Sequence, residues 1–203
     1  LPEANDLTFV LRVEPNDTSF VVSVRSAKKR RPQGLKLLVH RCGTQCYYKE
    51  WNPQHASLTF LRDELPGGLY QILLLSPTGE AYSERLVFNR RDDEAEVTMR
   101  QEGTLRQRSK VTLHFEVRDT KRRPAQGDFA VAVTDHKAAA PVATAGIYST
   151  LMLSSELRGV IEDPDWYFAP DNAQGDEGLD ELLLTQGWRR YDVPKLLRDE
   201  YKE

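Results

Sequence analysis

The sequence has few of the residues and patterns from which redox, metal and membrane-spanning elements are built. It contains two cysteines and four histidines in 203 residues, and no apolar stretch approaches the roughly 18–20 residues of a membrane-crossing helix. The formal net charge is −3, so no overall basic field favours nucleic acid or anionic lipid. We therefore expect no nucleic-acid partner and no membrane-spanning segment.

The two cysteines, Cys42 and Cys46, lie four positions apart. A structural zinc site uses about four nitrogen or sulfur ligands, and the nearest histidine, His40, could supply only one. A disulfide across so short a loop would add little stability, and two reduced thiols at a strand end fit the pattern equally well. The sequence thus predicts no metal ion and no cofactor, and it leaves both thiol states open.

Motifs that carry catalysis are missing from the sequence. The histidines form no His-Glu-x-x-His motif, Ser154 and Ser155 lie outside any Gly-x-Ser-x-Gly elbow, and no Rossmann or P-loop glycine pattern occurs. Asp163 and Asp165 flank Pro164, which is typical of a turn rather than of a catalytic carboxylate pair. We expect the chain not to be an enzyme and assign it no catalytic residue.

The first 91 residues show the alternation of apolar and polar side chains that indicates β-strands. Turn sequences such as Pro15-Asn16-Asp17 and Pro77-Thr78-Gly79 separate these strands. About six or seven short strands with turns between them predict an immunoglobulin-like β-sandwich over residues 1–91. The expected strands cover residues 7–14, 20–25, 35–41, 55–62, 69–75 and 82–88.

A second unit with the same order of elements follows a charged joint near residues 89–95. SFVVSVR…LKLLVH and VTLHFEVR…DFAVAV both read strand, basic Pro-Gly loop, strand, and Gly34 and Gly127 are 93 positions apart. This period is close to the ~100 residues of one immunoglobulin-like domain. We therefore predict a second, tandem β-sandwich over residues 92–203, with strands at 97–100, 110–118 and 128–135.

Two short amphipathic helices are expected on the second sandwich, near residues 147–158 and 177–187. Leu153 and Leu157 lie four positions apart in the first, and Leu179, Leu182 and Leu183 form an apolar stripe in the second. Each helix is shorter than the roughly 12–15 residues at which isolated helices become marginal in water. Both helices therefore require a packing partner.

Aromatic and arginine side chains near the end of the chain are the candidates for binding. They could stack on and hydrogen-bond to a glycan or peptide, or they could fill core and surface positions, the role that aromatic side chains most often have. The second interpretation is the stronger one. The candidate ligand or partner contacts are Trp166, Tyr167, Trp188, Arg189 and Arg190.

Several stretches resemble a known group of proteins. LPGGLYQILLLSPTGEAYSERLVFNR is similar to the strand pair of macroglobulin-like, immunoglobulin-like domains. FAVAVTD, LMLSSELRGVIEDPDWYF and LDELLLTQGWRRYD resemble large cell-envelope proteins of Bacteroides-type bacteria. Those proteins usually also carry carboxypeptidase-regulatory-like and TonB-receptor plug domains.

The resemblance implies a non-catalytic structural or interaction module in the periplasm, in the outer membrane or at the cell surface, with a link to TonB-dependent uptake. Its expected partners are other domains of a longer chain or other cell-envelope proteins. Two alternatives stay open. One is a glycan- or peptide-binding module that uses the aromatic and arginine candidates. The other is a protease-trapping module with a cleavable loop at residues 136–146.

Overall fold

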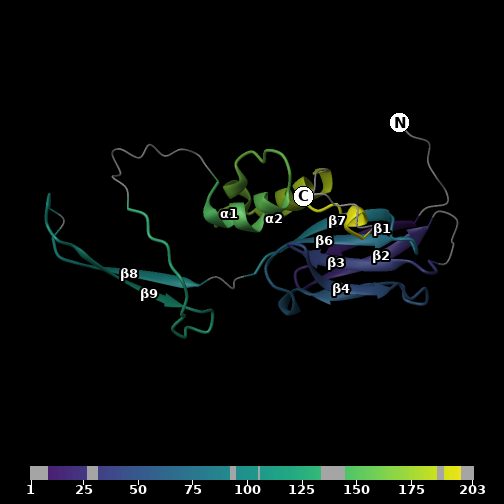
Figure 1. The fold of residues 1–203 in the computed structure, drawn as a ribbon, viewed down its shortest axis with the longest axis horizontal. Coiled ribbons are helices and arrows are strands. Elements are labelled where there is room, and N and C mark those ends of the chain that lie inside the picture. Colours follow the sequence, from purple (N-terminus) through teal and green to yellow (C-terminus); the bar gives the residue numbers. More distant parts are fainter. Residues whose placement is uncertain are drawn as a thin grey trace. The chain divides into compact units, whose positions relative to one another are not determined.

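The computed structural model describes residues 9–26, 32–91, 95–104, 106–133, 145–186 and 190–197. The described chain is mainly β, with antiparallel sheets and a few short helices (Figure 1), as the sequence predicted. It separates into two compact units. The first comprises the described residues within Leu1–Arg90 and Ala143–Glu203, and the second those within Arg91–Val142.

The first unit contains two antiparallel sheets that share one apolar core. One sheet has the strand order β1-β2-β5 and the other β4-β3-β6-β7. Strands of both sheets contribute to the core, in which Phe20 of β2, Trp51 and Ile72 of β6 are buried. The bounds are β1 Phe9–Pro15, β2 Ser19–Ser26, β3 Lys36–Arg41, β4 Thr44–Glu50, β5 Leu58–Leu61, the 3-10 turn η1 Arg62–Glu64, β6 Gly68–Leu75 and β7 Ala81–Asn89.

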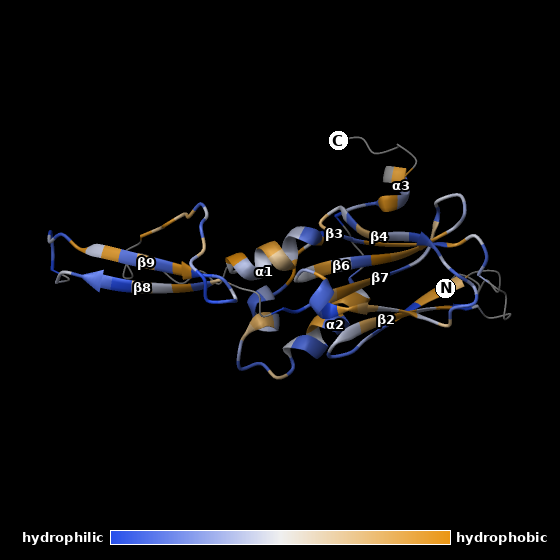
Figure 2. Ribbon diagram, turned by 90° about the horizontal axis from the view of Figure 1, so that it is seen from below, coloured by the Kyte–Doolittle hydropathy of each residue, from blue (hydrophilic) through white to orange (hydrophobic). Residues whose placement is uncertain are grey.

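Strand β6 is one of the two central strands of the larger sheet and is buried on both faces. Its sequence, GLYQILLL, is a nearly continuous apolar run, the pattern of a fully covered strand, and β6 is orange over most of its length in Figure 2. Tyr70, Ile72 and Leu74 face the core shared with the smaller sheet. The alternate residues Leu69, Leu73 and Leu75 point to the outer face and need a separate cover.

The C-terminal helical segments supply that cover. Leu69 of β6 and Phe88 of β7 pack with Leu153, Leu179 and Leu183 in one apolar cluster. A second cluster joins β3 and β6 to Val193. The segments are α1 Ile147–Met152, η2 Ser154–Glu156, η3 Pro164–Phe168, α2 Gly175–Thr185 and α3 Val193–Leu197. None of the described helices is long and apolar enough to cross a membrane.

This division differs from the prediction that residues 92–203 form one domain. The helices near 147–158 and 177–187 exist in shifted form, as α1 with η2 and as α2, but they belong to the same unit as strands β1–β7. The physical reason is the apolar outer face of β6 and β7. Burying one leucine contributes about 1.5–3 kcal/mol, and this face offers the helices several leucines at once.

The second unit contains one two-stranded antiparallel sheet, β8 Glu96–Glu102 with β9 Thr112–Arg118. The register pairs Val97 with Val117 and Met99 with Phe115, so these four side chains share one face. Charged residues such as Glu116 occupy the opposite face. Met99 and Phe115 are 62% and 48% exposed. The described part of this unit therefore leaves one apolar sheet face uncovered.

The predicted strand at 128–135 is not formed over its described part. Residues 128–133 belong to no strand, and the β-bridge next to them joins Arg118 to Pro124. The alternation of Phe129, Val131 and Val133 suits a strand. A strand also needs an edge to hydrogen-bond to, and none of the described strands pairs with this segment.

Candidate functional site

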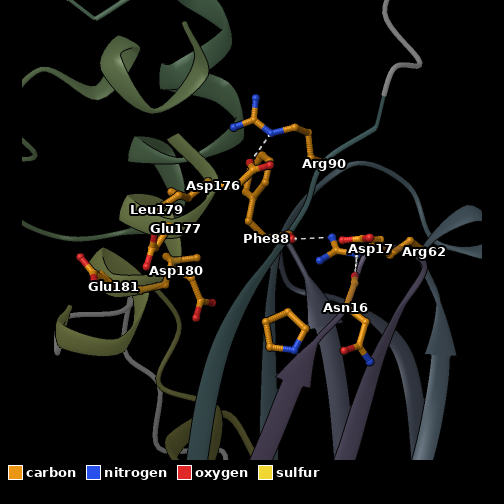
Figure 3. Close-up of a pocket in the computed structure, with 12 residues that line it drawn as sticks. Asn16, Asp17, Arg62, Phe88, Arg90, Asp176, Glu177, Leu179, Asp180 and Glu181 are labelled. Atoms are coloured by element: carbon orange, nitrogen blue, oxygen red, sulfur yellow. Dashed lines mark hydrogen bonds and ion pairs between the residues drawn. The ribbon is translucent and has the colours of Figure 1, made fainter. Parts of the chain in front are cut away.

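A pocket of about 610 Å³ opens in the first unit beside the β1–β2 turn, η1, the end of β7 and helix α2 (Figure 3). Its lining combines apolar and charged side chains. The chain reaches this place through four separate segments, which the two sheets and the docked helix bring together. The lining residues are Pro15, Asn16, Asp17, Arg62, Phe88, Arg90, Asp176, Glu177, Leu179, Asp180, Glu181 and Leu183.

Arg62 is fixed by the backbone around it. Its Nε donates to the carbonyl of Asn16 at 2.7 Å, and its Nη1 donates to the carbonyl of Phe88 at 3.0 Å, as Figure 3 shows. The guanidinium lies 4.2 Å from the centroid of the Phe20 ring, a cation–π arrangement. Burial lowers the pKa of Arg62, with nearby carboxylates, Asp176 first, acting in the opposite direction. Arg62 therefore ties the β1–β2 turn to β7.

Two ion pairs attach helix α2 to strand β7 and to Arg90, the residue that follows β7. Arg85 donates from Nη2 to both carboxylate oxygens of Asp180 at 2.7 Å, and Arg85 is 11% exposed while Asp180 is 34% exposed. Arg90 donates from Nε to Asp176 at 2.6 Å (Figure 3). Asp176 is itself largely exposed. The Arg85 pair is thus the more sheltered of the two.

The pocket carries an excess of negative charge. Its lining holds five carboxylates against Arg62 and Arg90. Among the described residues, Glu177 and Glu181 have no ion-pair partner. The described residues contain no cluster of histidine, cysteine and carboxylate groups that could hold a metal ion. The arrangement can attract a cation or a basic side chain.

The structure places the predicted binding residues in different surroundings. Trp166 packs edge-on against Tyr167, with ring centroids 5.2 Å apart, and lies against Gly178 of α2, although part of the indole is exposed. Arg190 bonds to Glu156 at 3.2 Å. Trp188 and Arg189 lie outside the described residues. Of the described candidates, Trp166, Tyr167 and Arg190 do not line the 610 Å³ pocket.

A smaller pocket of about 200 Å³ adjoins His40 on β3. His40 is buried, and neither ring nitrogen has a hydrogen-bond partner among the described residues. Its ring meets Tyr191 edge-on at 6.0 Å between centroids. Burial lowers the pKa of His40, while Gln71, Glu156 and Glu84 act in the opposite direction. The neutral imidazole is therefore favoured at this position.

The two cysteines lie in the β3–β4 hairpin with free thiols. Burial raises the pKa of the Cys42 thiol, and the carboxylate of Glu156 acts in the same direction. Burial also raises the pKa of Cys46. A nucleophilic cysteine needs a lowered pKa, so neither shift favours a nucleophilic thiol, although both thiols are exposed.

Comparison with protein-family models finds no match to this sequence, and comparison with curated proteins finds no relative.

Proposed function

We propose that this chain is a non-catalytic interaction module of a cell-envelope protein, located in the periplasm, in the outer membrane or at the cell surface and linked to TonB-dependent uptake through neighbouring domains. In this proposal the first unit is a macroglobulin-like, immunoglobulin-like scaffold. The second unit carries the docking surface. The observation that carries the proposal is the uncovered apolar face of the β8–β9 sheet.

An isolated two-stranded sheet is marginally stable in water at best. Contiguous exposed apolar patches mark interaction sites in folded proteins. The internal repeat supports the same interpretation, because a shift of 93 positions relates Leu113 and Phe115 of β9 to Phe20 and Val22 of β2. Phe20 and Val22 are buried beneath the larger sheet of the first unit. The β8–β9 face thus has the chemistry of a face that is normally covered.

The macroglobulin-like assignment is supported by the resemblance of LPGGLYQILLLSPTGEAYSERLVFNR to such domains. The location is supported by the stretches LMLSSELRGVIEDPDWYF and LDELLLTQGWRRYD, which resemble Bacteroides-type envelope proteins. In the structure, Leu153 and Leu157 of the first stretch and Leu179 and Leu183 of the second pack against β6 and β7. These stretches therefore have a structural role. That role is consistent with a scaffold that holds other parts in place.

Site-specific photo-crosslinking tests the docking surface. Benzoylphenylalanine would replace Met99, on the apolar face, or Arg100, its neighbour on the charged face, in the chain expressed in its own cell envelope. We expect crosslinks to another envelope protein, identified by mass spectrometry, from position 99 and at least about five-fold fewer from position 100. Equal crosslinking at the two positions, or none at position 99, would overturn the docking role.

A second candidate function, peptide binding, is favoured by the acidic 610 Å³ pocket. Its volume falls in the range of ligand sites, about 300–1,000 Å³, and its charge suits a lysine or arginine side chain. A fluorescent tri-lysine peptide should bind more tightly than a tri-glutamate peptide, and Glu177→Gln with Glu181→Gln should weaken binding. Equal binding of the two peptides would exclude this candidate.

The glycan- or peptide-binding alternative that uses Trp166, Tyr167, Trp188, Arg189 and Arg190 stays a prediction. The protease-trapping alternative depends on residues 136–146, of which 136–144 lie outside the described residues.

A further inference from the structure

The segment that follows β9 is an apolar strand sequence without a strand partner in the described chain. After the turn at Asp119–Arg123, the amide of Ala125 donates to the carbonyl of Val117 at 2.9 Å. Residues 128–133 then take part in no strand pairing. Phe129, Val131 and Val133 alternate along the segment and are 64%, 64% and 84% exposed.

This segment lacks the features that normally protect an exposed strand. Free edges are usually guarded by charged residues, by proline or by a bulge, and residues 129–133, FAVAV, contain no charge and no proline. A short uncharged window of high β-propensity pairs readily with another chain. The segment is therefore suited to accept a strand.

The partner that its sequence fits is an identical segment. In an antiparallel pair with a two-fold axis at Val131, Val131 lies opposite Val131 of the other copy, Phe129 opposite Val133, and Ala130 opposite Ala132. Larger apolar side chains then share one face and alanines the other, since side chains alternate along a strand. The two Asp128 carboxylates lie at opposite ends of the pair, so no like charges face each other.

The other two edges of this unit fit a second copy less well. Pairing β8 with itself around Met99 would place Glu96 opposite Glu102 twice, and like charges directly opposite are destabilising. The outer edge of β9 is already used near its end, where Val117 accepts the hydrogen bond from Ala125. Charge and backbone pairing thus select residues 128–133 among the three edges.

We propose that residues 128–133 form a two-fold antiparallel strand pair with the same residues of a second copy of this chain. The inference rests on the proposed function, because it names one partner of the second unit. Such an interface is isologous, since the same surface is used by both copies. The pairing also gives Phe129, Val131 and Val133 the strand partner that they do not have among the described residues.

Cysteine crosslinking tests the register directly. In a Cys42→Ser, Cys46→Ser background, which removes both exposed native thiols, Val131→Cys places two thiols opposite each other on the two-fold axis. Ala130→Cys is the matched control, because its thiol would face Ala132 of the other copy. We expect disulfide-linked dimer at least about ten-fold faster from Val131→Cys. Equal rates, or no dimer from Val131→Cys, would overturn the proposal.

The mass of the chain in solution gives an independent readout. We expect light scattering to report a mass twice the 23.2 kDa of one chain. Val131→Lys would bring two positive charges together in the pair, so we expect this variant to have the mass of one chain. If the chain without this substitution had the mass of one chain, the pairing would be overturned. A single-mass parent that still crosslinks another protein from Met99 would leave the proposed function standing. A dimer without such crosslinks would overturn the docking role alone.

Discussion

Replacing Leu179 by alanine tests whether helix α2 and the two sheets of the first unit unfold together. Leu179 is 2% exposed and packs in the cluster that contains Leu69, Leu86 and Phe88. Leucine-to-alanine changes at such positions cost about 2–5 kcal/mol through lost burial and the cavity left behind. We expect the free energy of unfolding to fall by about 3 kcal/mol. The control is Leu184→Ala on the same helix, which is 61% exposed and should change the value by less than about 0.5 kcal/mol.

The assay is urea unfolding followed by the fluorescence of Trp51, which lies on the other side of the larger sheet from Leu179. Trp51 is buried in the core shared by the two sheets, away from the cluster that contains Leu179. In a Trp166→Phe, Trp188→Phe background, Trp51 is the only tryptophan left of the three. With a urea m value of about 2 kcal/mol per M, typical of small domains, Leu179→Ala should lower the midpoint of the Trp51 transition by about 1.5 M.

The result that would refute this reasoning is a Trp51 transition that does not move while the far-UV circular dichroism of the helices does. The helices would then melt apart from the sheets, and the grouping of α2 with β1–β7 would fail. A midpoint shift of similar size for Leu184→Ala would contradict it in another way, because the effect would then reflect helix propensity rather than burial.

Further predictions concern charges. Asp180→Ala should lower the free energy of unfolding by about 2–3 kcal/mol, because it leaves the sheltered Arg85 guanidinium without its carboxylate partner. The loss is not larger because water partly screens Asp180. A loss below about 0.5 kcal/mol in urea unfolding would contradict this prediction. Burial lowers the pKa of His40 below its ordinary 6.5, so below about pH 6.5 the unfolded chain binds a proton that the folded chain excludes, and stability should fall as pH drops toward the folded pKa. His40→Gln should flatten this part of the urea-midpoint profile, and an unchanged slope would exclude His40 as the cause. Glu156→Gln should lower the raised pKa of Cys42 and speed its reaction with DTNB relative to Cys46, whereas equal acceleration of both thiols would indicate general loosening.

The strands that alternate and are bounded by turn residues could be predicted from the sequence. Residues 20–25 and 69–75 fall within β2 and β6, and residues 110–118 contain β9. Strand β4, Thr44–Glu50, was missed because it is an edge strand whose side chains are nearly all exposed. It is held by its register with β3, and neither face imposes an alternation.

The candidate pocket could not be predicted, because its contacts join positions far apart in the chain. Arg62 bonds to Asn16, 46 positions away, and Arg85 to Asp180, 95 positions away. Each of these residues is an ordinary surface type in its local sequence. Helix α2 docks through leucines that the sequence did identify, but nothing local says which sheet they cover. That choice depends on the apolar outer face of β6 and β7, which the helices cover.

The internal repeat shows how one sequence pattern can lead to two local structures. Gly34 has a left-handed φ of +70°, which favours glycine, and a Cβ there would lie 3.1 Å from Cγ of Pro77, close enough that the proline ring would have to shift. Gly127, its counterpart in the repeat, has no such φ, and the nearest atom to a Cβ is 3.9 Å away on Phe129. In the first unit the glycine leads into β3, which pairs with β4 and β6. In the second it leads into residues 128–133, which pair with none of the described strands, so this glycine is not followed by the paired strand that follows Gly34.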